Sequence, residues 1–520
     1  MYGTGTGTFT GRIQALALRS WRMNISLILQ MAAEAGPERI GLACDGRRWS
    51  YGALFRAARG AATRIAKSGC SHVALLDESS EAAAIALFGA AIAGIPYVPL
   101  NYRLADTDLA GMLDRIAPSY IIGDVERIER LSSGRGHAAL ARAAFVAEAE
   151  RVADSANTAE EVGEGIAVQL FTSGTTAAPK AALLRHANLF SYILGTVEFC
   201  SAAPEEAALV SVPPYHIASI AALLSLTYSM RRILLLPAFD PDDWLALAAT
   251  ERATNAFVVP TMLARIIARM DAGANADLSA LQAIAYGGGR MPMELIERAL
   301  DLFPQVGFTN AYGLTETSST IALLGPEEHR AAHRSSDPAV RARLGSVGKP
   351  LPTVQMEIRD DEGRKLPPGE RGEIYVRGDQ VSGEYRERKA LDTDGWFPTR
   401  DAGWLDEEGY LFVAGRADDV IVRGGENISP GEIEAVLLTH PAIADAAAVA
   451  VPSIEWGEAV GVAIVPRPGH APPREEELRT MIKNRLRSSR IPERIAVLGA
   501  LPYNEMGKLL RREIRALFRN

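Results

Sequence analysis

A short apolar run that ends in a loop of hydroxyl groups is the feature that most limits what this chain can fold into. Residues 166–171 are apolar apart from Gln169 and predict a buried β-strand. Thr172-Ser173-Gly174-Thr175-Thr176 follows at once, and Lys180 comes four residues later. The glycine lets the chain turn tightly, and clustered N–H and hydroxyl donors beside a cation suit a phosphate chain. Taken alone, such a loop is more often a plain polar turn, so the rest of the chain has to decide.

Apolar segments on both sides of this loop alternate with helical patterns. The expected strands before it are Ile40–Cys44, Val73–Leu76, Tyr97–Leu100 and Tyr120–Ile122. Those after it are Leu209–Val212, Ile233–Leu236, Ala256–Val259 and Ala283–Ala285. This alternation predicts an α/β fold of parallel sheets flanked by helices, arranged in two similar lobes. We also expect Ser50 to cap a helix from residue 51, and 126–164 to form a surface helix and a loose connector.

The pattern changes after Gly345. Short strand-like segments separated by Gly, Pro and Asp turns predict a small, mostly β module, and an α+β unit follows it. We expect a flexible lead-in at 1–22, a large N-terminal domain at 23–416 and a C-terminal domain at 417–520.

Charge and cysteine content narrow the class of protein. The formal net charge of −8 argues against general nucleic-acid binding. Three cysteines far apart in the sequence predict a reducing compartment and no disulfide framework. The N-terminus lacks the pattern of a signal peptide, and the two longest apolar stretches are interrupted by Gly, Pro or Arg. We therefore expect a cytoplasmic protein without a transmembrane segment.

Two further glycine-containing stretches offer surfaces for a nucleotide. In Tyr312-Gly313-Leu314-Thr315-Glu316, the ring of Tyr312 can face a base, Thr315 can bind a phosphate and Glu316 can bind Mg²⁺. In Gly287-Gly288-Gly289, bare backbone allows a flat ring to approach. Each stretch fits an ordinary turn about equally well.

Several single residues also have both a plain and a functional interpretation. Asp401 can accept hydrogen bonds from ribose hydroxyls, and Arg416 can add a cation. His216 follows an expected strand and can line a pocket. Arg423-Gly424-Gly425 is a polar loop, and Lys508 lies on a loop near the C-terminus. Considered alone, Asp401, the loop 423–425 and Lys508 are more simply structural or solvated, whereas the two interpretations of His216 have about equal weight.

Other catalytic patterns are missing. His329 and His333 have helical spacing, but no Glu follows the first His, so a zinc-protease site is not expected. The sequence contains no dinucleotide-binding glycine fingerprint, no Walker A lysine motif and no Gly-x-Ser-x-Gly elbow. Their absence disfavours dehydrogenase, P-loop ATPase and hydrolase functions.

Taken together, these stretches resemble the adenylate-forming (ANL) superfamily, and within it the acyl-CoA synthetases of the AMP-dependent synthetase and ligase family. The similarity runs from about Met23 to the end. Five motifs carry it in order: 171–180, 312–316, 399–401, 415–434 and 502–511. The resemblance implies an α/β N-terminal domain of two lobes plus a small β-barrel, which would be the AMP-binding (adenylation) domain. It also implies a mobile α+β C-terminal lid.

The resemblance also implies a two-step reaction. A carboxylic acid would attack ATP to give an acyl-adenylate, and a thiol, usually of CoA, would then displace AMP. ATP, Mg²⁺ and CoA would be the cofactors and co-substrate. The acid would be fatty or aromatic, since Ala218, Ala221 and Gly288 leave room in the expected pocket. The resemblance leaves monomer and homodimer open.

Roles then follow for the motif residues. Phosphates would be held by Thr172, Ser173, Gly174, Thr175, Thr176 and Lys180. Adenine would lie between Gly287–Gly289 and Tyr312. Catalysis would rest on Lys508, Glu316, Thr315 and His216, with Glu316 as the Mg²⁺ ligand. Ribose would be bound by Asp401 with help from Arg416. Arg423, Gly424 and Gly425 would face the CoA tunnel, and Asp418 would be the hinge.

Two positions depart from the family pattern. Ala177 and Arg400 stand where the family usually has glycine. They keep two alternatives open. In one, the adenylate passes to an amine, another nitrogen nucleophile or a carrier-protein thiol. In the other, the protein binds nucleotide without turnover, which is less favoured because Lys508, Glu316 and Asp401 are all present.

Overall fold

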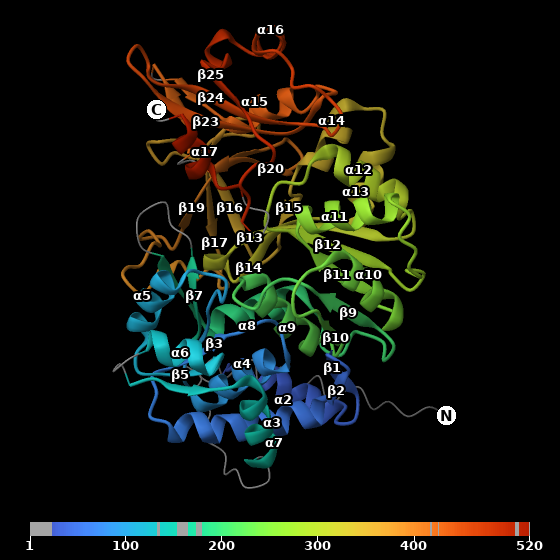
Figure 1. Ribbon diagram of the computed structural model, residues 1–520, viewed down its shortest axis with the longest axis vertical. Helices are drawn as coiled ribbons and strands as arrows, with labels where there is room; N and C mark the ends of the chain where they lie inside the picture. Colours follow the sequence, from blue (N-terminus) through green and yellow to red (C-terminus); the bar gives the residue numbers. More distant parts are fainter. Residues whose placement is uncertain are drawn as a thin grey trace.

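A computed structural model gives the fold (Figure 1). It describes residues 23–132, 136–152, 165–172, 179–416, 419–424, 426–504 and 509–518. Two large sheets with flanking helices form the N-terminal part, and two smaller sheets follow them. The expected α/β architecture with a small β module and an α+β C-terminal domain is confirmed.

The seven-stranded sheet contains the two strands on either side of the hydroxyl loop, residues 172–176. Its strand order is β18-β8-β7-β4-β3-β5-β6. The strands are β3 (His72–Leu76), β4 (Tyr97–Pro99), β5 (Ser119–Gly123), β6 (Ala138–Leu140), β7 (Ile166–Thr172), β8 (Lys180–Arg185) and β18 (Glu384–Tyr385). β7 and β8 are antiparallel and pair Thr172 with Lys180. The two ends of the hydroxyl loop are therefore held side by side.

The nine-stranded sheet has the order β15-β14-β13-β12-β11-β9-β10-β1-β2. Its strands are β1 (Ile40–Cys44), β2 (Arg47–Ser50), β9 (Ala207–Val210), β10 (Arg232–Leu235), β11 (Asn255–Val258), β12 (Ala283–Gly287), β13 (Gly307–Leu314), β14 (Ser319–Leu324) and β15 (Lys349–Pro350). β9 to β13 are mutually parallel, so their carboxyl ends share one edge. In open α/β sheets this edge is where ligands bind.

Helices cover these sheets. They are α2 (Ser26–Ala35), α3 (Tyr51–Lys67), α4 (Glu81–Ala93), α5 (Asp106–Ile116), α6 (Val125–Leu131), α7 (Arg142–Val152), α8 (His186–Thr196), α9 (Ile217–Tyr228), α10 (Pro241–Thr250), α11 (Pro260–Asp271), α12 (Met293–Leu302), α13 (Pro326–Arg334) and α14 (Pro338–Ala342). Ser50 caps α3 as predicted, because its side chain accepts a hydrogen bond from Ala53 N at 3.2 Å.

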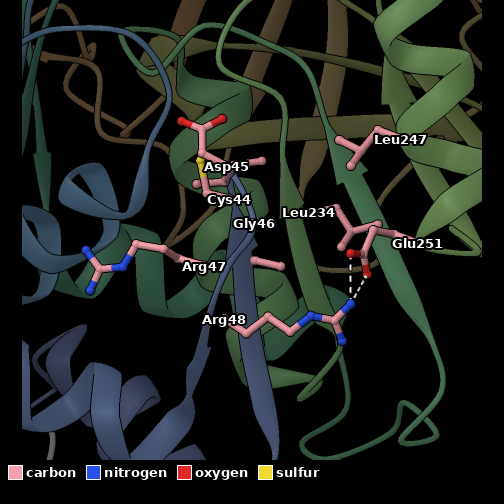
Figure 2. A pocket seen from close by; sticks show the side chains of 10 residues that line it. Cys44, Asp45, Gly46, Arg47, Arg48, Leu234, Leu247 and Glu251 are labelled. Atoms are coloured by element: carbon pink, nitrogen blue, oxygen red, sulfur yellow. Dashed lines mark hydrogen bonds and ion pairs between the residues drawn. The ribbon is translucent and has the colours of Figure 1, made fainter.

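One hairpin was missed by the sequence analysis. Residues 47–50 form β2 instead of leading straight into a helix, because Asp45 and Gly46 both have positive φ and turn the chain back on β1. Figure 2 shows how Arg48 anchors this hairpin to Glu251, with N–O distances of 2.8 and 2.9 Å. The cavity beneath it measures about 40 Å³ and suits a few waters rather than a nucleotide.

The prediction of a loose connector within residues 126–164 is partly wrong. β6 adds a parallel strand to β5, and α7 packs on α3. Phe145, Val146 and Ala149 are buried in the main core because they lie on one face of α7. Residues 153–164 of the same segment lie outside the described part of the chain.

The last two sheets are antiparallel apart from one edge pair. The first has the order β16-β17-β19-β20: Gln355–Arg359, Gly372–Arg377, Phe397–Leu405 and Leu411–Arg416. The second contains β21 (Ile421–Arg423), β22 (Glu426–Ile428), β23 (Ile443–Ser453), β24 (Gly457–Pro466) and β25 (Arg494–Val497). Helices α15 (Pro430–Leu437), α16 (Glu475–Arg485) and α17 (Arg511–Leu517) cover it.

Charged contacts hold this C-terminal unit against the N-terminal domain. Arg467 pairs with Glu294 at 2.9 Å, and Arg290 lies 3.7 Å from Glu434. The Arg467–Glu294 pair is exposed and therefore individually weak, whereas Glu434 of the second pair is buried. None of the helices in the described ranges is long and apolar enough to cross a membrane.

Candidate active site

The predicted nucleotide residues gather at the carboxyl ends of β12 and β13. Gly287 faces Ala311 across the two strands. A Cβ at Gly287 would lie 2.3 Å from the Ala311 carbonyl oxygen, so only glycine allows this approach. Gly288 follows with a φ of +78°, which bends the backbone out of the strand and leaves it exposed. The result is a flat backbone surface beside Tyr312.

Tyr312, Asp401 and Arg416 form one polar cluster. The Tyr312 hydroxyl donates to Asp401 Oδ2 at 2.6 Å, and Arg416 Nε lies 3.1 Å from Asp401 Oδ1. Asp401 and Arg416 are also paired residues of β19 and β20. Burial, followed by the charge of Asp401, raises the pKa of Tyr312 well above its usual value. The phenol therefore stays protonated and holds the carboxylate in place.

Glu316 is the centre of a second cluster. It lies in the 3₁₀ turn Thr315–Thr317 directly after β13, and it is 9% exposed. The Tyr385 hydroxyl donates to Glu316 Oε1 at 2.6 Å. The Lys180 ammonium lies 5.9 Å from the centre of the Tyr385 ring. Glu316 Oε2 has no hydrogen-bond partner among the residues that the structure describes, so it can bind a ligand.

The turn that carries Glu316 is fixed by the loop that leads into β18. Ser382 N and Gly383 N both donate to the Glu316 carbonyl oxygen, at 2.9 and 3.2 Å. Gln380 Nε2 donates to the Thr317 carbonyl oxygen at 3.1 Å. Glu316 is thus held through both its backbone carbonyl group and its side-chain carboxylate.

The two clusters share one electrostatic environment. Burial alone would lower the pKa of Arg416, but the surrounding Asp401, Tyr312 and Glu316 keep it above its usual value. The two carboxylates therefore lie close enough to act on one guanidinium. The first cluster offers a carboxylate paired with a guanidinium, and the second offers a carboxylate suited to a cation.

Tyr385 was not singled out from the sequence. It belongs to the two-residue strand β18. This strand pairs with β8, the strand that begins at Lys180. Nothing in the sequence near Tyr385 signals this pairing, because its partner lies about two hundred residues earlier in the chain.

The backbone conformation and the contacts of Arg400, which stands where the family usually has glycine, are defined in the structure. Its φ is +63°, the left-handed region that glycine favours. Its backbone N–H donates to Glu373 Oε1 at 3.1 Å, and its guanidinium lies 3.8 Å from the same oxygen. The side chain is 57% exposed. The arginine therefore contacts Glu373 of β17, and this polar contact offsets part of the backbone strain.

We expect Arg400→Gly to leave the KM for ATP within about twofold, because the guanidinium contacts Glu373 rather than the Asp401 cluster. Arg400→Val should destabilise the fold by about 1–2 kcal/mol, because a β-branched residue tolerates the left-handed region poorly. Steady-state kinetics and urea denaturation measure the two effects. A large rise in KM for the glycine variant would show that the arginine contacts the nucleotide.

Several predicted residues cannot be placed in this site. Ser173, Gly174, Thr175, Thr176, Ala177, Asp418, Gly425 and Lys508 lie outside the described residues. Arg423 and Gly424 are described, but their contacts are within the C-terminal unit. Arg423 pairs with Glu493 at 2.8 Å, and Gly424 N donates to the Trp456 carbonyl oxygen. The site roles of all these residues stay predictions.

The remaining predicted residues lie at strand ends and at the start of a helix. Thr172 and Lys180 end and begin the β7–β8 hairpin, and Thr172 Oγ1 donates to the Lys180 carbonyl oxygen at 3.4 Å. Thr315 precedes Glu316, and His216 is the N-cap residue of α9. His329 is part of the core instead, since its two ring nitrogens contact Tyr286 Oη and the Gly325 carbonyl oxygen at 2.8 Å each.

Comparison with known families agrees with this geometry. Residues 29–386 match the AMP-binding enzyme family, and residues 432–508 match the AMP-binding enzyme C-terminal domain. The chain belongs to this family of AMP-binding enzymes. It is an adenylate-forming ligase that binds ATP and forms AMP.

Individual relatives extend over almost the whole chain. The fatty acid–[acyl-carrier-protein] ligase ScoC of Streptomyces coeruleorubidus is 32% identical over 503 residues, covering 94% of this chain and 95% of the relative. The o-succinylbenzoate CoA synthetase of Bacillus subtilis, solved with its acyl-adenylate intermediate, is 28% identical with a TM-score of 0.78, covering 94% and 97%. The amide bond synthetase McbA of Marinactinospora thermotolerans is 28% identical with a TM-score of 0.81, covering 95% and 100%.

Proposed function

We propose that this enzyme is an acid–CoA ligase, which activates a carboxylic acid with ATP and transfers the acyl group to the thiol of CoA. The observation that carries the proposal is that the Tyr312 cluster and the Glu316 cluster both lie at the carboxyl end of β13. Tyr312 holds Asp401, and Glu316, four residues later, is held by Tyr385. One cluster suits the nucleoside and the other suits the charged phosphates.

The ribose and adenine fit the first cluster. Asp401 accepts hydrogen bonds, so its carboxylate matches the two hydroxyls of a ribose. The ring of Tyr312 and the backbone of Gly287–Gly289 would lie on opposite faces of the adenine. Arg416 would offset the charge of Asp401 and of the nearby phosphate.

A magnesium ion fits the second cluster. No group of three or more His, Cys, Asp or Glu side chains forms a metal site within the described ranges. Mg²⁺ is commonly bound by one or two carboxylates together with substrate phosphates, so the single carboxylate of Glu316 agrees with it. The ion would neutralise the charge of the leaving pyrophosphate.

The roles of the residues outside the described ranges complete the proposal. Ser173 to Thr176 would cradle phosphates together with Thr172 and Lys180, because both ends of that loop are held at β7 and β8. Lys508 would stabilise the charge that develops during adenylation, and Asp418 would be the hinge of a moving lid. A lid that moves lets one cleft serve two successive reactions.

Among the possible acceptors of the acyl group, the segment 423–430 favours CoA. It is the part of the sequence most like CoA ligases, and the Bacillus subtilis relative is a CoA synthetase. A carrier-protein thiol and an amine are the alternatives, since ScoC is a carrier-protein ligase and McbA is an amide bond synthetase.

We expect carboxylate-dependent exchange between ATP and pyrophosphate with at least one acid from a panel of fatty and aromatic acids. The exchange should fall about tenfold or more in Lys508→Ala, because the variant lacks a cation aimed at the transferring group. Product analysis with CoA, a carrier protein or an amine as the acceptor then identifies the second step. Absence of exchange with every acid would refute the proposal.

A further inference from the structure

Arg115 joins three segments that lie far apart in the sequence. It stands in the last turn of α5, and its side chain is 26% exposed. Arg115 Cζ lies 4.9 Å from the centre of the Phe171 ring, and its Nη1 donates to the Pro179 carbonyl oxygen at 2.5 Å. Its own carbonyl oxygen accepts a hydrogen bond from the Arg386 side chain. One arginine therefore contacts the last turns of β7, the residue before β8 and the residue after β18.

Two of these contacts are each one residue away from a predicted phosphate ligand. Phe171 precedes Thr172, the last residue of β7. Pro179 precedes Lys180, the first residue of β8. The two strands pair Thr172 with Lys180, so a shift of either strand end would move both side chains. Arg115 holds the two strand ends together from outside the pair.

The guanidinium lies on the face of these strands that is turned away from the phosphate side chains. Successive side chains of a strand point to opposite faces, so the Phe171 ring lies on the face opposite to Lys180. Phe171 packs against the core cluster to which α5 contributes, whereas Lys180 lies against the Tyr385 ring. Arg115 can therefore support the strand ends without occupying the space that phosphates need.

A further ion pair of Arg115 adds little to this arrangement. Arg115 Nη2 pairs with Glu387 Oε1, but the Glu387 side chain is 50% exposed, and exposed ion pairs are individually weak. The contacts that act on the strands are those with Phe171 and Pro179. A planar guanidinium makes both at once, because its face stacks on a ring while its edge donates hydrogen bonds.

We propose that Arg115 is a positioning residue for the pyrophosphate part of ATP. It holds Phe171 and Pro179 and thereby keeps Thr172 and Lys180 in place before the nucleotide binds, so binding does not have to order them. AMP lacks the pyrophosphate part, and its affinity does not depend on this arginine. The inference rests on the proposed function, in which Thr172 and Lys180 bind phosphates.

Calorimetric titration with ATP and Mg²⁺, and separately with AMP, in the absence of an acid tests the inference. Arg115→Met keeps an apolar stem but lacks the cation and its donors. It should raise the Kd for ATP about tenfold and leave the Kd for AMP within about twofold. Arg115→Lys keeps the charge without the planar fork and should raise the Kd for ATP about threefold, so it continues the test if Arg115→Met does not fold. Glu387→Gln removes only the exposed ion pair and, as the matched control, should bind both nucleotides as the wild type does.

Phe171→Leu, alone and combined with Arg115→Met, tests whether the arginine acts through the ring. The single variant should weaken ATP binding, and it should add little in the Arg115→Met background, because the two residues act as one contact. Fully additive losses would overturn the inference, since the arginine would then act on the phosphates by another route. An equal loss for ATP and AMP, or an unchanged Kd for ATP in the Arg115 variants, would also overturn it. Failure of ATP–pyrophosphate exchange with every acid would instead refute the proposed function, whereas the two Kd values, measured without an acid, decide the inference.

Discussion

Glu316→Gln is expected to lower the rate of adenylate formation by about 10²- to 10³-fold, the equivalent of several kcal/mol of transition-state stabilisation. The substitution keeps the shape of the side chain and its hydrogen bond with Tyr385, but removes the negative charge that would bind Mg²⁺. The KM for the acid should change little. Pre-steady-state pyrophosphate release over a range of Mg²⁺ concentrations measures the effect.

Tyr385→Phe tests how the carboxylate is oriented. It removes the donor that lies 2.6 Å from Glu316 Oε1, and loss of such a supporting hydrogen bond typically weakens metal binding about 10- to 100-fold. Calorimetric titration of ATP with and without Mg²⁺ should show weaker binding of the Mg²⁺ complex only. Glu387→Gln, an exposed carboxylate near β18, is the control. Normal activity of Glu316→Gln at low Mg²⁺ would contradict the assigned role.

The elements and the nucleotide motifs could be predicted from sequence because both are local. Apolar runs of three or four residues between helical segments predicted the strands β9 to β12 within a few residues. Tyr312 and Glu316 were recognisable because they share one short motif at the end of one strand. The sequence predicted Asp401 as a hydrogen-bond acceptor, but it did not show that Tyr312 is the donor.

The contacts that complete the site could not be predicted, because they join distant parts of the chain. Tyr385 reaches Glu316 only because β18 pairs with β8, and a two-residue strand leaves no periodic pattern to read. The strain at Arg400 likewise depends on a φ that the sequence does not reveal, although the family's usual glycine there pointed to it.

Asp401→Ala is expected to weaken ATP binding by about 10- to 100-fold, since it removes charge-assisted hydrogen bonds worth about 1.5–3 kcal/mol. The main effect should be on the KM for ATP, in contrast to Glu316→Gln, because the ribose is held equally in the ground state and in the transition state. Asp401 also joins Tyr312 to Arg416, so the variant should lose about 1–3 kcal/mol of stability. ATP calorimetry and urea denaturation measure these two losses.

Asp401→Asn separates the two effects of that change. The amide oxygen can still accept the Tyr312 hydrogen bond, but the ion pair with Arg416 is lost. Its stability should therefore lie between those of the wild type and Asp401→Ala, with ATP binding still reduced. Asp361→Ala, an exposed aspartate of the same domain, should change neither quantity. If Asp401→Ala lost stability but bound ATP normally, Asp401 would only support Tyr312 and Arg416, and the ribose would have to be bound elsewhere.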